Sequence, residues 1–305
     1  MTRAGGPGSE APRDRHAFGS RRLRALVLGA GDRPQVVEEW ERQAAMVAEH
    51  VDIVLVDFEG TSTIEDSTAD FVLVLGGDGS ILRSARQMGS NQLPVLGVNL
   101  GKLGFLAGIN PEQLSTVLPL IASGDCKVVE HLMFECSLVE HGRLVETRLG
   151  LNEVVIHAGP PFSLLRVNFS VDGELATTYS CDGLIISTPV GSTAHSLSAG
   201  GPILRQDLQA FVICPISPHT LTVRPIVDSA DRIFEMTVTA PNIGTTLVVD
   251  GRTMGTITAG SKVVVKRAPQ RFSMIEVASR SYYRTLRDKL GWAGTIAEMR
   301  TEPQK

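Results

Sequence analysis

The 305-residue sequence lacks the features that mark membrane, secreted and nucleic-acid-binding proteins. No apolar run approaches the roughly 20 residues that a helix needs to span a bilayer, and no signal-peptide core follows the basic N-terminus. The net charge of −4 provides no basic field for a nucleic-acid backbone. These absences predict a cytoplasmic protein that binds neither membranes nor nucleic acid.

Cysteine is also scarce, and its spacing excludes two further classes of protein. The cysteines lie far apart, without the paired spacing of a zinc site or the dense spacing of a secreted disulfide scaffold. They are Cys126, Cys136, Cys181 and Cys214. We expect reduced thiols, and the sequence identifies no metal ligands.

The chain changes character along its length. Residues 1–20 mix Gly, Pro, Ser and charge with almost nothing to bury, which predicts a disordered tail. Residues 21–125 alternate short apolar runs with helical periods, which is typical of an α/β domain with a doubly wound parallel sheet. Residues 126–269 consist of runs rich in Val, Thr, Phe and Ile between turn signals, which predicts a β-rich second domain.

Apolar stripes at helical spacing predict where the longer helices lie. The stripes in the first domain are Val36, Trp40, Ala44 and Val47, and Leu114, Val117, Leu118 and Ile121. A last helix is marked by Tyr282, Leu286 and Leu290 and closed by Gly291. We expect residues 270–300 to return to the first domain and this helix to pack against it.

The stretch FVLVLGGDGSILRSAR, residues 71–86, carries the first sign of chemistry. A buried strand that ends in glycines before a helix lets backbone N–H groups approach a phosphate. Asp78 would repel that phosphate unless it binds a metal or accepts the proton of an attacking hydroxyl, and both are kinase roles. The alternative is a tight turn in which Asp78 caps a helix starting near Ile81.

Other nucleotide-binding classes are excluded by missing motifs. The chain has neither the G-x-x-x-x-G-K-[ST] loop of Walker-type NTPases nor the catalytic-loop and metal-binding motifs of protein kinases. VLGAGD, after the first strand, lacks the third glycine of a dinucleotide fingerprint, so a hydride-transferring dehydrogenase is disfavoured.

Several blocks together resemble bacterial NAD kinases, from about residue 23 to Trp292. They are LGGDGSILR (75–83), NLGKLGFLA (99–107), LNEVVIHAG (151–159), CDGLIISTPVGSTAHSLSAGGPIL (181–204), VVDGR (248–252) and YYRTLRDKLGW (282–292). The first block alone is shared with lipid kinases and 6-phosphofructokinases, whereas the long glycine and serine block is far more specific.

The resemblance implies transfer of the ATP γ-phosphoryl group to the 2′-hydroxyl of the adenosine ribose of NAD, with a divalent metal, expected to be magnesium. Asp78 then resembles the family's proton acceptor. The resembling phosphate loop comprises Gly76, Gly77, Gly79 and Ser80. The resemblance also makes the β-rich domain the part that binds NAD and forms a homodimer or homotetramer.

Further residues acquire NAD-binding roles through the same resemblance. Asn152 and Glu153 match the family's pair that holds ribose hydroxyls, for which an amide and a carboxylate are chemically suited. Asp182 resembles the acid that meets the nicotinamide end. The remaining members of the expected NAD-binding set are Asp78, Gly79, Arg83, Thr193, Ala194, His195, Ser196, Leu197, Ser198 and Arg252.

Each of these assignments has a plainer alternative. LNEVVIH also describes an ordinary strand, the Asp-Gly pairs at 172, 182 and 250 are typical of turns, and Ser or Thr before a helix is a common cap. We expect a hairpin turn at Asp172. Arg83 is either a phosphate contact or part of a solvated helix face.

Three residues depart from the family's usual pattern: Val190 stands for Thr, His195 for Tyr and Arg252 for Gln. These departures leave open a non-catalytic NAD(P)-sensing module, and the shared GGDG loop leaves open a lipid or sugar kinase. The sequence also leaves open NAD against NADH as acceptor and ATP against polyphosphate as donor.

Overall fold

The computed structural model describes residues 21–291 apart from 65, 102–103, 161–163 and 277–281. The predicted tail at residues 1–20, and the part of the predicted return that follows residue 291, lie outside these described residues.

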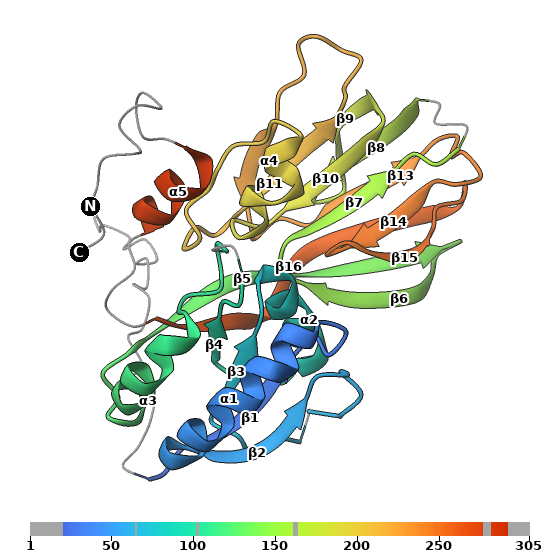
Figure 1. Cartoon of the computed structure of the whole chain (residues 1–305). Helices are drawn as coiled ribbons and strands as arrows, with labels where there is room; N and C mark the ends of the chain where they lie inside the picture. The colour runs from blue at the N-terminus through green and yellow to red at the C-terminus, as the bar shows by residue number, and fades with distance from the viewer. Residues whose placement is uncertain (1–20, 65, 102–103, 161–163, 277–281, 292–305) are drawn as a thin grey trace, which may run out of the picture.

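The first half of the chain forms a parallel sheet with helices on both faces, as predicted (Figure 1). The strands follow the order β2-β1-β3-β4, with the switch point between β1 and β3. They are β1 (Arg24–Gly29), β2 (Asp52–Asp57), β3 (Phe71–Leu75) and β4 (Val95–Val98). One face packs against α1 (Pro34–His50) and α3 (Leu114–Ala122), and the other against α2 (Asp78–Met88).

The helix starts follow from local sequence. Pro34 occupies the first turn of α1, where its missing N–H has no intrahelical partner to lose. Before α3 lies a short 3-10 helix, η1 (Pro111–Gln113), where the side chains of Asn110 and Gln113 form a reciprocal capping box. The apolar stripe predicted for α3 is fully buried.

The second half is built from two sheets with a large apolar core between them (Figure 1). One sheet is antiparallel, in the order β12-β11-β10-β7-β14-β15. Its strands are β7 (Glu153–His157), β10 (Gly183–Ser187), β11 (Ala210–Ile216), β12 (Ile226–Ser229), β14 (Thr246–Val249) and β15 (Arg252–Thr256). Between β10 and β11 lie η2 (Gly191–Thr193) and α4 (His195–Ser198).

The other sheet of this half continues the parallel sheet of the first half. Its strands are β5 (Lys127–Glu140), β6 (Arg143–Gly150), β8 (Leu165–Val171), β9 (Glu174–Cys181), β13 (Phe234–Val238) and β16 (Ser261–Glu276). β16 pairs with β5 and β13, and at Met274 it meets Val95 of β4 in parallel register. Its pairing with β5 is irregular between Arg267 and Arg271, where the predicted boundary at 269–270 falls.

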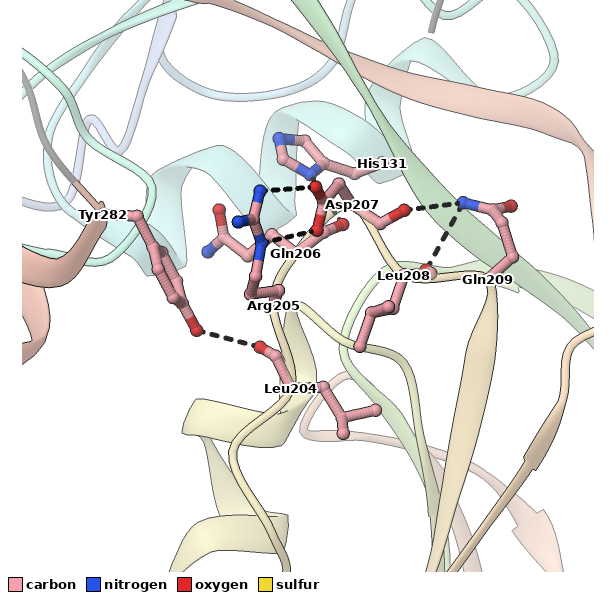
Figure 2. A network of polar contacts seen from close by, with 8 residues as sticks. All are labelled: His131, Leu204, Arg205, Gln206, Asp207, Leu208, Gln209 and Tyr282. Atoms are coloured by element: carbon pink, nitrogen blue, oxygen red, sulfur yellow. Dashed lines mark hydrogen bonds and ion pairs between the residues drawn. The ribbon is translucent and has the colours of Figure 1, made fainter. Parts of the chain in front are cut away.

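Two side chains of helix α5 (Tyr282–Leu290) contact residues outside the helix. The Tyr282 hydroxyl donates a hydrogen bond of 2.9 Å to the carbonyl of Leu204 (Figure 2). The Lys289 ammonium lies 5.5 Å from the centre of the Phe105 ring. Gly291 follows with φ +64°, as expected of a glycine that ends a helix. The packing of this helix against the first domain stays a prediction. Among the described helices, none is long and apolar enough to cross a membrane.

Candidate active site

The glycine loop follows β3 at the carboxyl end of the parallel sheet. Gly76 has φ +133°, and a Cβ there would lie 2.2 Å from the Ser80 hydroxyl oxygen, so only glycine fits. Its N–H donates to the carbonyl of Val98 at 2.9 Å, which ties the loop to β4. At Gly77 and Gly79 a Cβ would meet open space instead. The N-terminus of α2 is therefore accessible to an anion at these two glycines.

The Asp78 carboxylate holds the loop that follows β4. It accepts the N–H groups of Phe105, Leu106 and Ala107 at 2.8, 3.0 and 3.2 Å. Gly104 lies so close that a Cβ there would be 2.0 Å from Oδ1 of Asp78. Asp78 is the first residue of α2, and its side chain bonds to this distant loop. The N-cap residue of α2 is Gly77, which has no side chain to cap the helix.

A second group of predicted residues comes together where β7 and β10 pair. Glu153 lies opposite Ser187, and the loop after β10 folds back over the start of β7. The Thr188 N–H donates to the carbonyl of Asn152 at 2.9 Å. A Cβ at Gly191 would lie 2.1 Å from that carbonyl oxygen, so the close approach requires glycine. The LNE block and the glycine and serine block thus form one structure.

Glu153 is a buried acid with unused hydrogen-bonding capacity. Its side chain accepts the backbone N–H of His195, while Oε2 is buried without a partner. Burial, followed by the nearby charge of Asp250, raises the pKa of Glu153 to about 8. An orphaned carboxylate oxygen suits a ligand hydroxyl, because a buried polar atom is costly until it is paired.

Asp250 fixes the backbone beneath this acid. Its carboxylate accepts the N–H groups of Leu151, Asn152 and Glu153 at 2.8, 2.8 and 3.1 Å. Burial raises the pKa of Asp250, and these three hydrogen bonds oppose that rise. Sequence reasoning treated this Asp-Gly pair as a turn and missed the role of the side chain. The available signal was an aspartate directly after the strand Thr246–Val249.

The segment that follows β10 contains residues 193–198 of the expected NAD-binding set. Thr193 lies in η2 and its hydroxyl donates to the Val190 carbonyl at 3.1 Å. The Ser196 hydroxyl is buried without a partner, beside the start of α4. The side chain of Val190 is buried in the apolar cluster that contains Leu151, which explains an apolar residue at this departure from the family pattern.

Asp182 lies apart from Glu153. It immediately precedes β10, whereas Glu153 pairs with Ser187 at the other end of that strand. Five residues of strand separate these ends by roughly 16 Å. The backbone of Asp182 donates to Ile216 and accepts from Ala158, at 3.0 and 2.9 Å. Only a long ligand can contact both acids.

Asp172, the remaining Asp-Gly pair, forms the expected hairpin turn between β8 and β9. Asp172 and Gly173 have φ values of +51° and +85°, which fit a tight two-residue turn. Its carboxylate also pairs with Arg232 at 2.7 Å. No ligand role is needed to explain this residue.

The described residues contain no group of three or more His, Cys, Asp and Glu side chains arranged to hold a metal ion. The oxygens of the Asp78 carboxylate accept three backbone N–H groups. These residues therefore do not provide a preformed cage for a resident metal.

Comparison with known proteins decides the family. The model of the ATP-NAD kinase N-terminal domain matches residues 23–126, and that of the ATP-NAD kinase C-terminal domain matches residues 151–277. The curated NAD kinase of Rhodopirellula baltica is 53% identical over 274 residues, which are 90% of this chain and 88% of that protein. The chain belongs to the NAD kinase family. The NAD kinase of Geotalea daltonii is 42% identical over 224 residues, 73% of this chain and 79% of that protein.

Solved structures agree with this assignment. Yeast NADH kinase complexed with NADH superimposes with a TM-score of 0.80 at 23% identity over 90% of both chains, and so shows the same fold. An NAD kinase from Archaeoglobus fulgidus in complex with ATP gives 0.71 at 25% identity, over 88% of this chain and 99% of that one. The predicted family and fold class are confirmed. A phosphotransferase of this family is favoured over a lipid or sugar kinase.

Proposed function

We propose that this protein phosphorylates NAD to NADP by transferring the γ-phosphoryl group of ATP to the 2′-hydroxyl of the adenosine ribose. The observation that carries this proposal is the pairing of an accessible helix N-terminus at Gly77 and Gly79 with a buried acid, Glu153, that has an unused oxygen. One apolar cluster joins the two places, because it contains Ile81 of α2 and Leu151, two residues before Glu153.

In this proposal the dinucleotide binds where the start of β7 pairs with the end of β10. The orphaned Oε2 of Glu153 accepts a ribose hydroxyl, and Asn152 adds an amide beside it. Residues 193–198 line the nucleotide, with the buried Ser196 hydroxyl as a further partner. Asp182, at the far end of β10, meets the nicotinamide part of an extended NAD molecule.

Asp78 is the proposed acceptor of the 2′-hydroxyl proton. It stands at the N-terminus of α2, where the phosphoryl group would be stabilised by helix N–H groups. The three N–H donors from residues 105–107 fix its carboxylate in one orientation, which is what a positioned base requires.

The test is purified full-length protein with ATP, magnesium and NAD, followed by an enzyme that responds only to NADP. NADP formation in the wild type that nearly vanishes in Asp78→Asn, with NAD binding mostly kept in calorimetry, supports the assignment. Near-normal turnover of the variant would rule out Asp78 as the base. A thermal melt of the variant separates loss of the base from loosening of the loop at residues 105–107.

The similarity to curated NAD kinases favours the enzyme over the second candidate, a non-catalytic module that senses NAD(P). A sensor binds NAD saturably in calorimetry and forms no NADP with ATP or polyphosphate. NADP formation by the wild type eliminates this candidate.

We further propose a cytoplasmic homodimer or homotetramer whose magnesium arrives as the ATP complex, as part of the substrate. Support for self-association comes from apolar side chains left exposed on strands of the β-rich half. Leu144 and Val145 of β6 are 65% and 55% exposed, and Leu175 of β9 is 59% exposed. Light scattering coupled to size-exclusion chromatography measures the oligomeric state, and a monomer at micromolar concentration contradicts this part of the proposal.

A further inference from the structure

Four arginines from three elements gather beside α2. Arg83 and Arg86 lie one turn apart on α2, which contacts β6 (Figure 1). Arg148 of β6 reaches across to β15, where its Nη1 donates to the Thr253 carbonyl at 2.8 Å. Arg252, the residue before Thr253, begins β15. These four residues are called the arginine cluster below.

The charges of the arginine cluster are incompletely neutralised. Arg86 is half-buried, and burial, together with the charges of the other three arginines, lowers its pKa. The acids near the cluster are already engaged. Both oxygens of Asp250 accept backbone N–H groups, and Glu146 pairs with Arg148 at 2.5 Å. Among the described residues, Arg86 makes no ion pair within 4.0 Å. Like charges in a half-buried setting are unfavourable until an anion joins them.

The cluster is also placed along the helix that starts at the phosphate loop. Arg83 and Arg86 lie five and eight residues beyond Asp78, which is about 7 and 12 Å along the axis of α2. A phosphate chain whose terminal group lies at the N-terminus of α2 can therefore extend toward the cluster. Guanidinium groups suit phosphate oxygens because they donate paired hydrogen bonds.

We propose that the arginine cluster binds the phosphate chain of the phosphoryl donor. This proposal rests on the proposed function and revises the expectation that Arg83 and Arg252 contact NAD. The shared chemistry is a linear chain of phosphate groups, supplied either by ATP or by inorganic polyphosphate.

The experiment measures KM for each substrate in Arg252→Gln, because the Arg252 side chain is exposed and its loss does not threaten folding. We expect KM for the donor to rise roughly tenfold, as for one charge-assisted hydrogen bond, and KM for NAD to change less than twofold. The assay is run separately with ATP and with inorganic polyphosphate, and the rise applies to whichever donor the enzyme accepts. A rise in KM for NAD alone would overturn the proposal.

Arg143→Gln is the matched control, because Arg143 begins the same strand as Arg148 and is exposed at its far end. It should change neither KM. Arg86→Gln, checked first by its thermal melt, should produce a larger rise in KM for the donor than Arg252→Gln.

Calorimetry with inorganic tripolyphosphate separates failure of this proposal from failure of the proposed function. If the wild type forms no NADP, the proposed function fails, yet tripolyphosphate binding that weakens roughly tenfold in Arg252→Gln still supports an anion site. Tripolyphosphate that binds the wild type, Arg86→Gln and Arg252→Gln equally would overturn the arginine cluster as its site, whatever the activity.

Discussion

Asp250 and Glu153 hold each other through the backbone in both directions. The Asp250 N–H donates to the Glu153 carbonyl at 3.0 Å, and the Asp250 carboxylate accepts the Glu153 N–H at 3.1 Å. The buried acid of the candidate site is therefore fixed by a second buried acid that directly follows the neighbouring strand β14. This arrangement sets the geometry of Glu153, and the charge of Asp250 adds to the rise in pKa that burial produces.

Asp250→Asn should weaken both folding and NAD binding. The NH₂ group of the variant amide faces at least one of the three N–H donors and leaves it without an acceptor, so the free energy of unfolding should fall by roughly 1–3 kcal/mol in urea denaturation. Asp172→Asn is the control, since Asp172 also precedes glycine at positive φ but lies exposed in a hairpin. An equal loss in both variants would contradict the role given to Asp250.

Glu153 should make the protein less stable as the pH rises. Its pKa is about 8 in the folded protein against 4.5 as the ordinary value, so unfolding between these pH values releases a proton. The glutamine of Glu153→Gln does not titrate, so the variant releases no proton at this position when it unfolds. Its stability relative to the wild type should therefore increase by up to about 1.4 kcal/mol per pH unit between pH 5 and 8. Urea midpoints at pH 5.5, 6.5 and 7.5 measure this, and a difference that stays constant with pH would refute it.

His131 should make the protein sensitive to mild acid. This side chain of β5 is 2% exposed, and burial lowers its pKa to about 4, whereas the carbonyl of Gln206 and the charge of Asp207 oppose that shift (Figure 2). Below about pH 6.5 His131 is protonated in the unfolded chain but stays neutral in the folded protein. Stability therefore falls as the pH drops toward 4. His131→Gln should lose less stability than the wild type between pH 7 and 5, while the exposed His219→Gln should behave like the wild type.

Gly191→Ala should separate the loop after β10 from β7. The added Cβ would lie 2.1 Å from the Asn152 carbonyl oxygen and 2.5 Å from its carbon, which are backbone atoms that cannot rotate away. We expect a loss of about 1–3 kcal/mol in stability and weaker NAD binding by calorimetry. Gly101→Ala, where a Cβ meets open space, is the matched control for stability. Unchanged NAD affinity in Gly191→Ala would argue against this loop as the dinucleotide site.

The sequence alone predicted the elements whose signals are local. The stripe from Leu114 to Ile121 and the strand before Gly76 are visible as periodicity and apolar runs, and both are present. The change of pattern near residue 126 predicts where the chain divides, and that boundary stays a prediction. Family membership was predictable because the long glycine and serine block is specific, and the comparisons confirm it.

What the sequence did not reveal depends on contacts between distant residues. Asp78 and Phe105 are 27 positions apart, and Asp250 and Leu151 are 99 apart. The hydrogen bonds between these carboxylates and backbone N–H groups therefore leave no local pattern in the sequence. The arginine cluster is similar, because Arg86 and Arg148 meet only once β6 lies beside α2. A turn signal such as Asp-Gly describes the backbone and says nothing of the partners of the carboxylate.

Strand β16 belongs to both halves at once, since its Met274 pairs with Val95 of β4 and its earlier residues pair with β13. Among the described residues, the two halves are therefore joined through a shared strand of one sheet and not by a flexible linker alone. A change in the distance between α2 and the paired ends of β7 and β10 therefore involves twisting or bending of β16 together with β5, which pairs along it, most easily at the irregularity between Arg267 and Arg271. If nucleotide binding changes this distance, the change would twist the sheet that the two halves share.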